Sequence, residues 1–143
     1  MKQGREIRFA RWDEDWQLIK DIRHSVFVVE QSVPPDLEWD GSDRECQHII
    51  ALDQDRCIGT GRMTPDGKIG RMAVHRECRN DGVGRSILMA LIEYARDQLK
   101  LSSVSLSAQI SAIGFYEKRG FYRVGDEFWD AGIVHTKMIC DLL

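Results

Sequence analysis

The chain has 143 residues, of which 43% are apolar and 30% charged, and its formal net charge is −3. This composition is typical of one globular domain over residues 1–143 and excludes disordered, collagen-like and fibrous chains. The acidic balance argues against nucleic-acid binding, and no run approaches the ~20 apolar residues that span a bilayer.

The first elements predicted are a strand and a helix. Residues 7–11 alternate between apolar and polar side chains, which indicates a strand, and Asp13 is the expected N-cap of the helix that follows. That helix should end before Pro34-Pro35, because proline disfavours helical geometry in the preceding residue. Residues 36–45 are acidic and are expected to form a loop. The apolar face of the helix consists of Leu18, Ile19, Ile22, Val26 and Phe27.

Three strands are predicted next. Residues 48–52 and 57–63 are joined by Asp53-Gln54-Asp55-Arg56, which indicates a hairpin. A turn at Pro65-Asp66-Gly67 leads to a strand over residues 68–74.

The second half of the chain contains the longest predicted helix, residues 83–99, which has one apolar face. A short helix over 111–119 should stop at Gly120, the residue type expected just past a helix end. Further strands are expected at 104–108, 121–124 and 135–142.

The connections between these elements predict the fold class. Strands joined by tight turns are antiparallel, whereas the link from Val74 to Val104 contains a long helix and therefore joins parallel strands. We expect an α/β (α+β) fold, with a mixed, mostly antiparallel sheet that has one central parallel pair and helices packed on it.

A glycine-containing turn, Arg79-Asn80-Asp81-Gly82-Val83-Gly84-Arg85-Ser86, lies between a strand and the longest helix. Glycine lets the backbone approach a ligand closely, and the free N–H groups of the first helical turn favour an anion. Arg79 and Arg85 add charge, and arginine binds phosphate oxygens at two points. The turn predicts an anion site suited to a pyrophosphate, and an ordinary glycine-eased helix start is the alternative. It lacks the Gly-Lys-Ser/Thr of a Walker loop and the third glycine of the dinucleotide fingerprint.

Together with the strand Ile69-Gly70-Arg71-Met72-Ala73-Val74 and the later segment Phe115-Tyr116-Glu117-Lys118-Arg119-Gly120-Phe121, this turn resembles the GNAT superfamily of acetyl-CoA-dependent N-acetyltransferases. The cofactor motif of that family reads Arg/Gln-x-x-Gly-x-Gly/Ala, and residues 79–84 match it at every fixed position. The resemblance covers residues 7–142. Three further features look like the ElaA-like branch: residues 23–31, the Glu38/Asp40/Asp43/His48 series and Gly132-Ile133-Val134-His135.

The resemblance implies that acetyl-CoA, as the acyl donor, lies in a V-shaped gap between splayed parallel strands, residues 68–74 and 104–109. The pantetheine arm would pair with the backbone of residues 72–74, and the pyrophosphate would bind the amides of residues 79–85. The cofactor-binding residues expected on this basis are Met72, Ala73, Val74, Arg79, Asn80, Asp81, Gly82, Val83, Gly84, Arg85, Ser86, Gln109, Phe115 and Tyr116.

Direct attack of an amine on a thioester needs an oxyanion donor, a base and a proton donor for the thiolate, and a backbone N–H near Val74 would be the oxyanion donor. Tyr116 matches the family tyrosine and is the expected proton donor, with a core aromatic as the alternative. His135 is the expected base, because imidazole accepts a proton near neutral pH. A histidine that faces solvent is the alternative there, and Val134 replaces the proline often found before it.

Candidate substrate residues are Arg23, Glu30, Glu38, His48 and Arg71. Glu30, Glu38, Asp40 and His48 are rival bases or an acidic rim that attracts a cationic amine, whereas a solvated loop face is the alternative. Arg23 and Arg71 would bind a substrate carboxylate, with surface salt bridges as the alternative.

The sequence therefore predicts an N-acetyltransferase that acts on a primary amine of a small molecule or peptide, without metal, nucleic acid or membrane as a partner. A non-catalytic acyl-CoA-binding module or inactive paralogue is one alternative, and a structural domain is another. Four cysteines without a Cys-x-x-Cys pair, and no secretory signal, predict reduced thiols in the cytoplasm. The amine acceptor and a homodimer through an exposed strand stay open.

Overall fold

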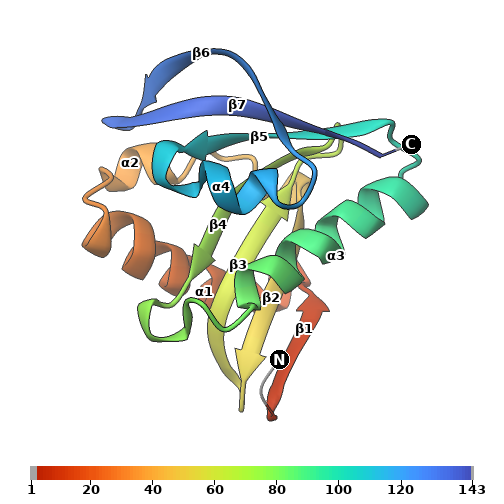
Figure 1. Cartoon of the computed structure of the whole chain (residues 1–143). Helices are drawn as coiled ribbons and strands as arrows, with labels where there is room; N and C mark the ends of the chain where they lie inside the picture. The colour runs from red at the N-terminus through yellow and green to blue at the C-terminus, as the bar shows by residue number, and fades with distance from the viewer. Residues whose placement is uncertain (1–2, 143) are drawn as a thin grey trace.

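The computed structural model describes residues 3–142, and its seven strands form one sheet in the order β1-β2-β3-β4-β5-β7-β6 (Figure 1). The strands are β1 (Arg5–Phe9), β2 (Gln47–Asp53), β3 (Arg56–Met63), β4 (Lys68–Val74), β5 (Ser103–Gln109), β6 (Tyr122–Asp130) and β7 (Ile133–Asp141). The helices are α1 (Trp12–Arg23), α2 (Pro35–Glu38), α3 (Val83–Asp97) and α4 (Ile113–Glu117). No helix within residues 3–142 is long and apolar enough to cross a bilayer.

The centre of the sheet is buried on both faces because helices cover each of them. Along β2, Ile49 and Ala51 pack with the apolar face of α3, whereas Ile50 and Leu52 pack with Ile19 of α1. Successive strand residues point to opposite faces, so the continuous apolar run Ile-Ile-Ala-Leu supplies both layers. The two helices therefore sandwich β2, β3 and β4 between them.

The parallel pair of the sheet opens soon after it begins. β4 and β5 are its one parallel pair, and they pair only at Lys68–Ser105 and Ile69–Leu106, while all other neighbours are antiparallel. Figure 1 shows β4 and β5 running apart beyond this point. These features confirm the predicted mixed, mostly antiparallel sheet with a splayed parallel pair and flanking helices.

The first helix and the acidic segment differ from the prediction. Arg11 is the N-cap, not Asp13, because the backbone leaves the extended conformation at Arg11 and the carboxylate of Asp15 accepts the Arg11 N–H at 2.8 Å. Asp13 instead pairs with Arg44. α1 continues as a π-helix over His24–Glu30 and ends before the prolines as predicted. The expected acidic loop contains α2 and a 3₁₀ turn, Asp43–Glu45, since proline suits the first turn of a helix.

Two C-terminal elements differ from the prediction: the short helix is divided in two, and β6 is longer. The expected helix over 111–119 is a 3₁₀ turn, Ile110–Ala112, followed by α4. Gly120 ends it as predicted, with φ +91°, while Phe121 donates to the Tyr116 carbonyl and Gly120 to that of Glu117, a Schellman motif. β6 runs on to Asp130 because it pairs with β7 through a bulge, although its side chains are exposed. A homodimer through such an edge strand stays a prediction.

Candidate active site

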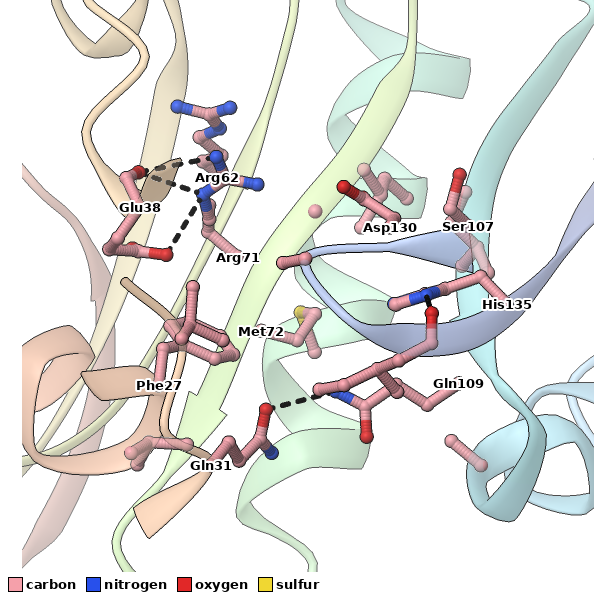
Figure 2. A pocket seen from close by; sticks show the side chains of 18 of the residues that line it. Phe27, Gln31, Glu38, Arg62, Arg71, Met72, Ser107, Gln109, Asp130 and His135 are labelled. Carbon is pink, nitrogen blue, oxygen red and sulfur yellow. Dashed lines mark hydrogen bonds and ion pairs between the residues drawn. The ribbon is translucent and has the colours of Figure 1, made fainter. Parts of the chain in front are cut away.

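A cavity of about 600 Å³ lies where β4 and β5 diverge. Figure 2 shows Glu38, Arg62 and Arg71 on one side of it and Ser107, Asp130 and His135 on the other. Met72 lies between them, and Gln31 and Gln109 lie below in the same view. Of the residues predicted to bind a cofactor, Met72, Val74, Arg79, Gln109 and Tyr116 line this cavity.

β4 carries a bulge beside the cavity. On β3, Thr60 pairs with Ala73 and Arg62 with Gly70, so Arg71 and Met72 together oppose one residue, Gly61. Arg71 has φ +47°, the left-handed region that non-glycine residues seldom occupy. A bulge leaves backbone groups out of the ladder and redirects side chains, and the β4 pairing with β5 ends at Ile69. β4 therefore presents unpaired backbone to the gap, where an extended ligand would add as a strand.

The N-terminus of α3 supplies an anion site next to β4. Gly82, with φ +84°, is the N-cap, and the first intrahelical bond runs from Ser86 N to Gly82 O at 3.0 Å. The N–H groups of Val83, Gly84 and Arg85 precede that bond and have no intrahelical acceptor. A Cβ on Gly84 would lie 3.6 Å from Val74 Cγ2, so the end of β4 approaches the helix start closely. This donor set fits a diphosphate beside an extended arm.

The charged side chains of this turn differ in whether an ion pair already holds them. Arg79 donates from both terminal nitrogens to the Glu30 carboxylate, and its Nε donates to the Val74 carbonyl at 3.0 Å. Asp81 pairs with Nη1 of Arg5 at 3.2 Å, which offsets a negative charge near the anion site. Arg85 is exposed and makes no ion pair among residues 3–142, so it is available to a bound anion.

Tyr116 lines the cavity from α4, and its ring packs edge-on against Phe115 and Phe121. Burial raises the pKa of the Tyr116 hydroxyl to about 12. The hydroxyl therefore keeps its proton at neutral pH and can donate it. Phe115 stays outside the cavity lining and faces Gly84 of α3.

His135 lines the cavity from β7, and its ring stacks on Phe128 with centroids 6.0 Å apart. Its Nδ1 lies 2.8 Å from the carbonyl oxygen of Ile133. A carbonyl only accepts hydrogen bonds, so in the neutral imidazole Nδ1 carries the proton and Nε2 holds the free lone pair. This tautomer lets Nε2 act as a proton acceptor.

A cluster of three arginines and three carboxylates forms the wall behind Glu38. Arg23 is 1% exposed and donates to Glu38 Oε1 and, at 2.7 Å, to Asp43 Oδ1. Arg62 donates to Asp40 and Asp43 at 3.0 and 2.9 Å. Burial raises the pKa of Glu38, whereas the Arg62 guanidinium holds the pKa of Asp40 well below its usual range. Arg71, the third arginine of the cluster, pairs with Glu38 and Asp40 and also lines the cavity.

Three of the candidate substrate residues do not line the cavity. Arg23 is enclosed by its ion pairs, and Glu30 holds Arg79. His48 is 3% exposed, stacks on Trp12, and points Nε2 at the Asp43 carbonyl at 2.8 Å. These contacts correct the expectation that Arg23 and His48 meet substrate, because both are packed as structural groups. Glu38 and Arg71 do line the cavity.

The cavity also includes residues that the sequence analysis did not single out. Gln31 accepts a hydrogen bond from Gln109 at 3.0 Å, and Lys68, Ser107 and Asp130 also line the cavity. Asp130 precedes the turn signal Ala131-Gly132, which would have placed it at a hairpin tip. Nothing in the sequence pattern places it in the same cavity as Lys68. Within residues 3–142, no group of three or more His, Cys, Asp or Glu side chains could hold a metal ion.

Comparisons with known proteins agree with this geometry. The family model of the acetyltransferase (GNAT) domain matches residues 18–142. The chain is 39% identical over 124 residues to the uncharacterized N-acetyltransferase YjcF of Bacillus subtilis, covering 84% of this chain and 88% of YjcF. Escherichia coli ElaA is 27% identical over 129 residues, which are 85% of this chain and 84% of ElaA.

Two crystal structures extend the comparison to the fold. That of ElaA has a TM-score of 0.85 at 24% identity, covering 96% of this chain and 99% of ElaA. An acyl-CoA N-acyltransferase from Pseudomonas aeruginosa has a TM-score of 0.80 at 26% identity, covering 95% of this chain and 99% of that protein.

Proposed function

The chain belongs to the GNAT acetyltransferase family, and on that premise we propose that it transfers an acetyl group from acetyl-CoA to a primary amine of a small molecule or peptide. The observation that carries this proposal is the meeting of three features in one cavity: the open backbone of β4, the protonated Tyr116 and the acceptor nitrogen of His135.

Two sets of unpaired backbone groups, at the start of α3 and along the end of β4, would hold the acyl donor. The N–H groups of residues 83–85 would bind the diphosphate, with Arg85 as an added charge. The backbone of Met72, Ala73 and Val74 would pair with the pantetheine arm. When bound, acetyl-CoA supplies the acetyl group as a thioester. The related Pseudomonas aeruginosa structure, described as an acyl-CoA N-acyltransferase, supports an acyl-CoA donor.

The chain's own groups would then handle the charges and protons. An amine attacks the thioester carbon, the C–S bond breaks and an amide forms. A backbone N–H of β4 near Val74 stabilises the developing oxyanion, and His135 Nε2 takes the proton that the amine loses. Tyr116 donates its proton to the departing thiolate. Glu38 keeps to its ion pairs with Arg23 and Arg71 and is the less suited base.

All four cysteines, Cys46, Cys57, Cys78 and Cys140, are free thiols. Free thiols throughout support the proposal of a reducing, cytoplasmic setting.

The proposal is tested by measuring acetyl-CoA-dependent thiol release across an amine panel, with mass spectrometry of the product. We expect release with at least one amine and a product heavier by one acetyl group. Tight acetyl-CoA binding without release from any amine would instead identify a non-catalytic CoA-binding module. No rise in melting temperature at acetyl-CoA in large excess would favour a structural domain.

A His135→Gln variant tests the base. Glutamine is a polar side chain of similar size to histidine, but it cannot accept a proton near neutral pH. We expect the rate to fall about a hundredfold and the acid limb of the pH–rate profile to disappear. An unaltered pH–rate profile would assign the base to a carboxylate or a water relay.

A further inference from the structure

The charges at the acceptor end of the cavity are divided between its two walls. β3 and β4 supply Arg62 and Arg71, which Figure 2 shows across the cavity from Asp130 of β6 and His135 of β7. Lys68 of β4 also lines the cavity. The acids Glu38 and Asp40 also lie on the first wall, so the sign of that wall depends on which arginines already hold them.

The buried arginines hold these carboxylates. Arg62, with a side chain 9% exposed, binds Asp40 and Asp43, and Arg23 binds Glu38 and Asp43. Arg71 therefore meets carboxylates that already have an arginine, and its own contacts are longer, 3.3 Å to Glu38 and 3.4 Å to Asp40. Its side chain is 25% exposed, and its Nη1 makes no hydrogen bond to any group within residues 3–142.

Lys68 adds an uncompensated charge to the same wall. It lines the cavity, is exposed, and has no ion pair in the described part of the chain. Three arginines share three carboxylates and Lys68 is unpaired within residues 3–142, which leaves this wall with a net positive charge. A second ammonium on a substrate would be repelled here, and a carboxylate would be attracted.

The opposite wall has the reverse character. Asp130 lines the cavity without a basic partner among residues 3–142, and His135 presents the lone pair of Nε2. An ammonium group would be drawn to Asp130, and once it has given its first proton to solvent the neutral amine faces Nε2 of His135. The wall that the proposed mechanism uses for the amine is therefore the negative one.

We infer that the acceptor is a small amino carboxylate, an amino acid or a close relative, whose carboxylate binds Arg71 and Lys68 while its amine faces Asp130 and His135. This inference rests on the proposed function and specifies its substrate class. The size of the cavity favours a small acceptor, because about 600 Å³ is the volume of a pocket for one drug-sized ligand and must hold the thioester arm as well. Polyamines are disfavoured because one of their ammonium groups would meet Lys68.

The test compares each amino carboxylate with its own carboxamide, which keeps the amine and the length but removes the charge. The pairs are glycine and glycinamide, β-alanine and β-alaninamide, and alanine and alaninamide. We expect kcat/KM to favour the carboxylate at least tenfold in one or more pairs, and ethylenediamine to be poorer than either member. Equal or better use of the amide in every pair would overturn the inference while leaving the proposed function intact.

Charge reversal at Lys68 tests the site itself. Lys68→Glu should lower the carboxylate-to-amide ratio of kcat/KM at least tenfold, whereas Lys100→Glu, at an exposed lysine outside the cavity, should leave that ratio unchanged. Asp130→Asn should raise KM severalfold for both members of each pair and leave the ratio as it is. A Lys68→Glu ratio equal to that of the unmutated chain contradicts the assignment.

A binding readout separates failure of this inference from failure of the proposed function. The melting temperature of the CoA-loaded protein is measured with each carboxylate and each amide. If no amine gives thiol release, the proposed function is wrong, and a shift larger for the carboxylates still supports the ligand class. Equal shifts within every pair overturn the inference whether or not thiol is released.

Discussion

The carboxylate of Glu30 accepts hydrogen bonds from both terminal nitrogens of Arg79, with Nη2 2.7 Å from Oε1. This ion pair joins the end of the π-helix to the turn before α3, and the bond from Arg79 Nε to Val74 extends the link to β4. Arg79 matches the first position of the phosphate motif in the sequence, yet its guanidinium is held by a protein carboxylate. Arg79 therefore positions β4, and Arg85 is the freer cation.

Arg79 and Arg85 are expected to affect acetyl-CoA binding differently. Arg85→Ala should weaken binding of acetyl-CoA about fivefold but leave S-acetylpantetheine binding unchanged, because its charge acts only on phosphate. Arg79→Ala should weaken both ligands, since it loosens the end of β4. Calorimetric titration of both ligands against both variants measures this, and an Arg79→Ala effect confined to acetyl-CoA would show direct phosphate binding instead.

Removing the hydroxyl of Tyr116 should slow turnover without changing donor binding. The pKa of about 12 keeps Tyr116 protonated, so Tyr116→Phe takes away a proton donor but preserves the ring that packs on Phe115 and Phe121. We expect kcat to fall about a hundredfold and the acetyl-CoA Kd to stay within about twofold. Tyr122→Phe, at an exposed tyrosine on β6, is the control, and equal activity of both variants would remove Tyr116 from the mechanism.

The sequence was sufficient for the order of the strands and of the longer helices. Hydrophobic alternation predicted β1, turn signals predicted β2, β3 and β4, Gly120 predicted the end of α4, and the long helix between 74 and 104 predicted the parallel pair. These features depend on local spacing and turn chemistry, which a single sequence carries. The start of α1 was less predictable, because the Arg11 side chain caps nothing and the Arg11 backbone N–H instead donates to the carboxylate of Asp15.

The site was only partly predictable because its charges depend on pairing across the fold. His48 was expected to meet substrate, but stacking on Trp12 and burial make it a structural residue. Glu30 and Arg79 are far apart in the chain, so sequence could not show that they neutralise each other. Lys68 and Asp130 face one cavity because β4 and β5 splay, and no local pattern encodes that juxtaposition.

His48 should make the free energy of unfolding depend on pH at values below the ordinary pKa of histidine. Burial lowers the pKa of His48 in the folded chain, whereas an unfolded histidine has a pKa of about 6.5. As pH falls below about 6.5, the unfolded chain takes up a proton that the folded chain does not. The free energy of unfolding should therefore fall by up to about 1.4 kcal/mol per pH unit for this group.

Urea unfolding at about pH 7.5, 6.5 and 5.5, a range that spans the titration of an unfolded histidine, tests this dependence. His48→Gln should flatten the slope, and His24→Gln, at an exposed histidine of the π-helix, should leave it intact. A slope that survives in His48→Gln would assign the dependence to another group.

The cluster around Arg23 should be costly to break. Arg23→Met would leave Glu38 and Asp43 buried without their shared cation, which typically costs about 3–5 kcal/mol. Arg44→Met, which removes an exposed pair with Asp13, should cost no more than about 1 kcal/mol. Urea unfolding compares the two variants, and an Arg23→Met loss as small as that of Arg44→Met would mean that Arg62 and Arg71 suffice for the cluster.

In the proposed function, backbone amides at the start of α3 hold the diphosphate of the acyl donor beside β4. Calorimetric titration with acetyl-dephospho-CoA, which keeps the diphosphate, and S-acetylpantetheine, which lacks it, tests that claim directly. Two or three charge-assisted hydrogen bonds predict binding about a hundredfold tighter for acetyl-dephospho-CoA. Equal affinities for the two compounds would contradict it.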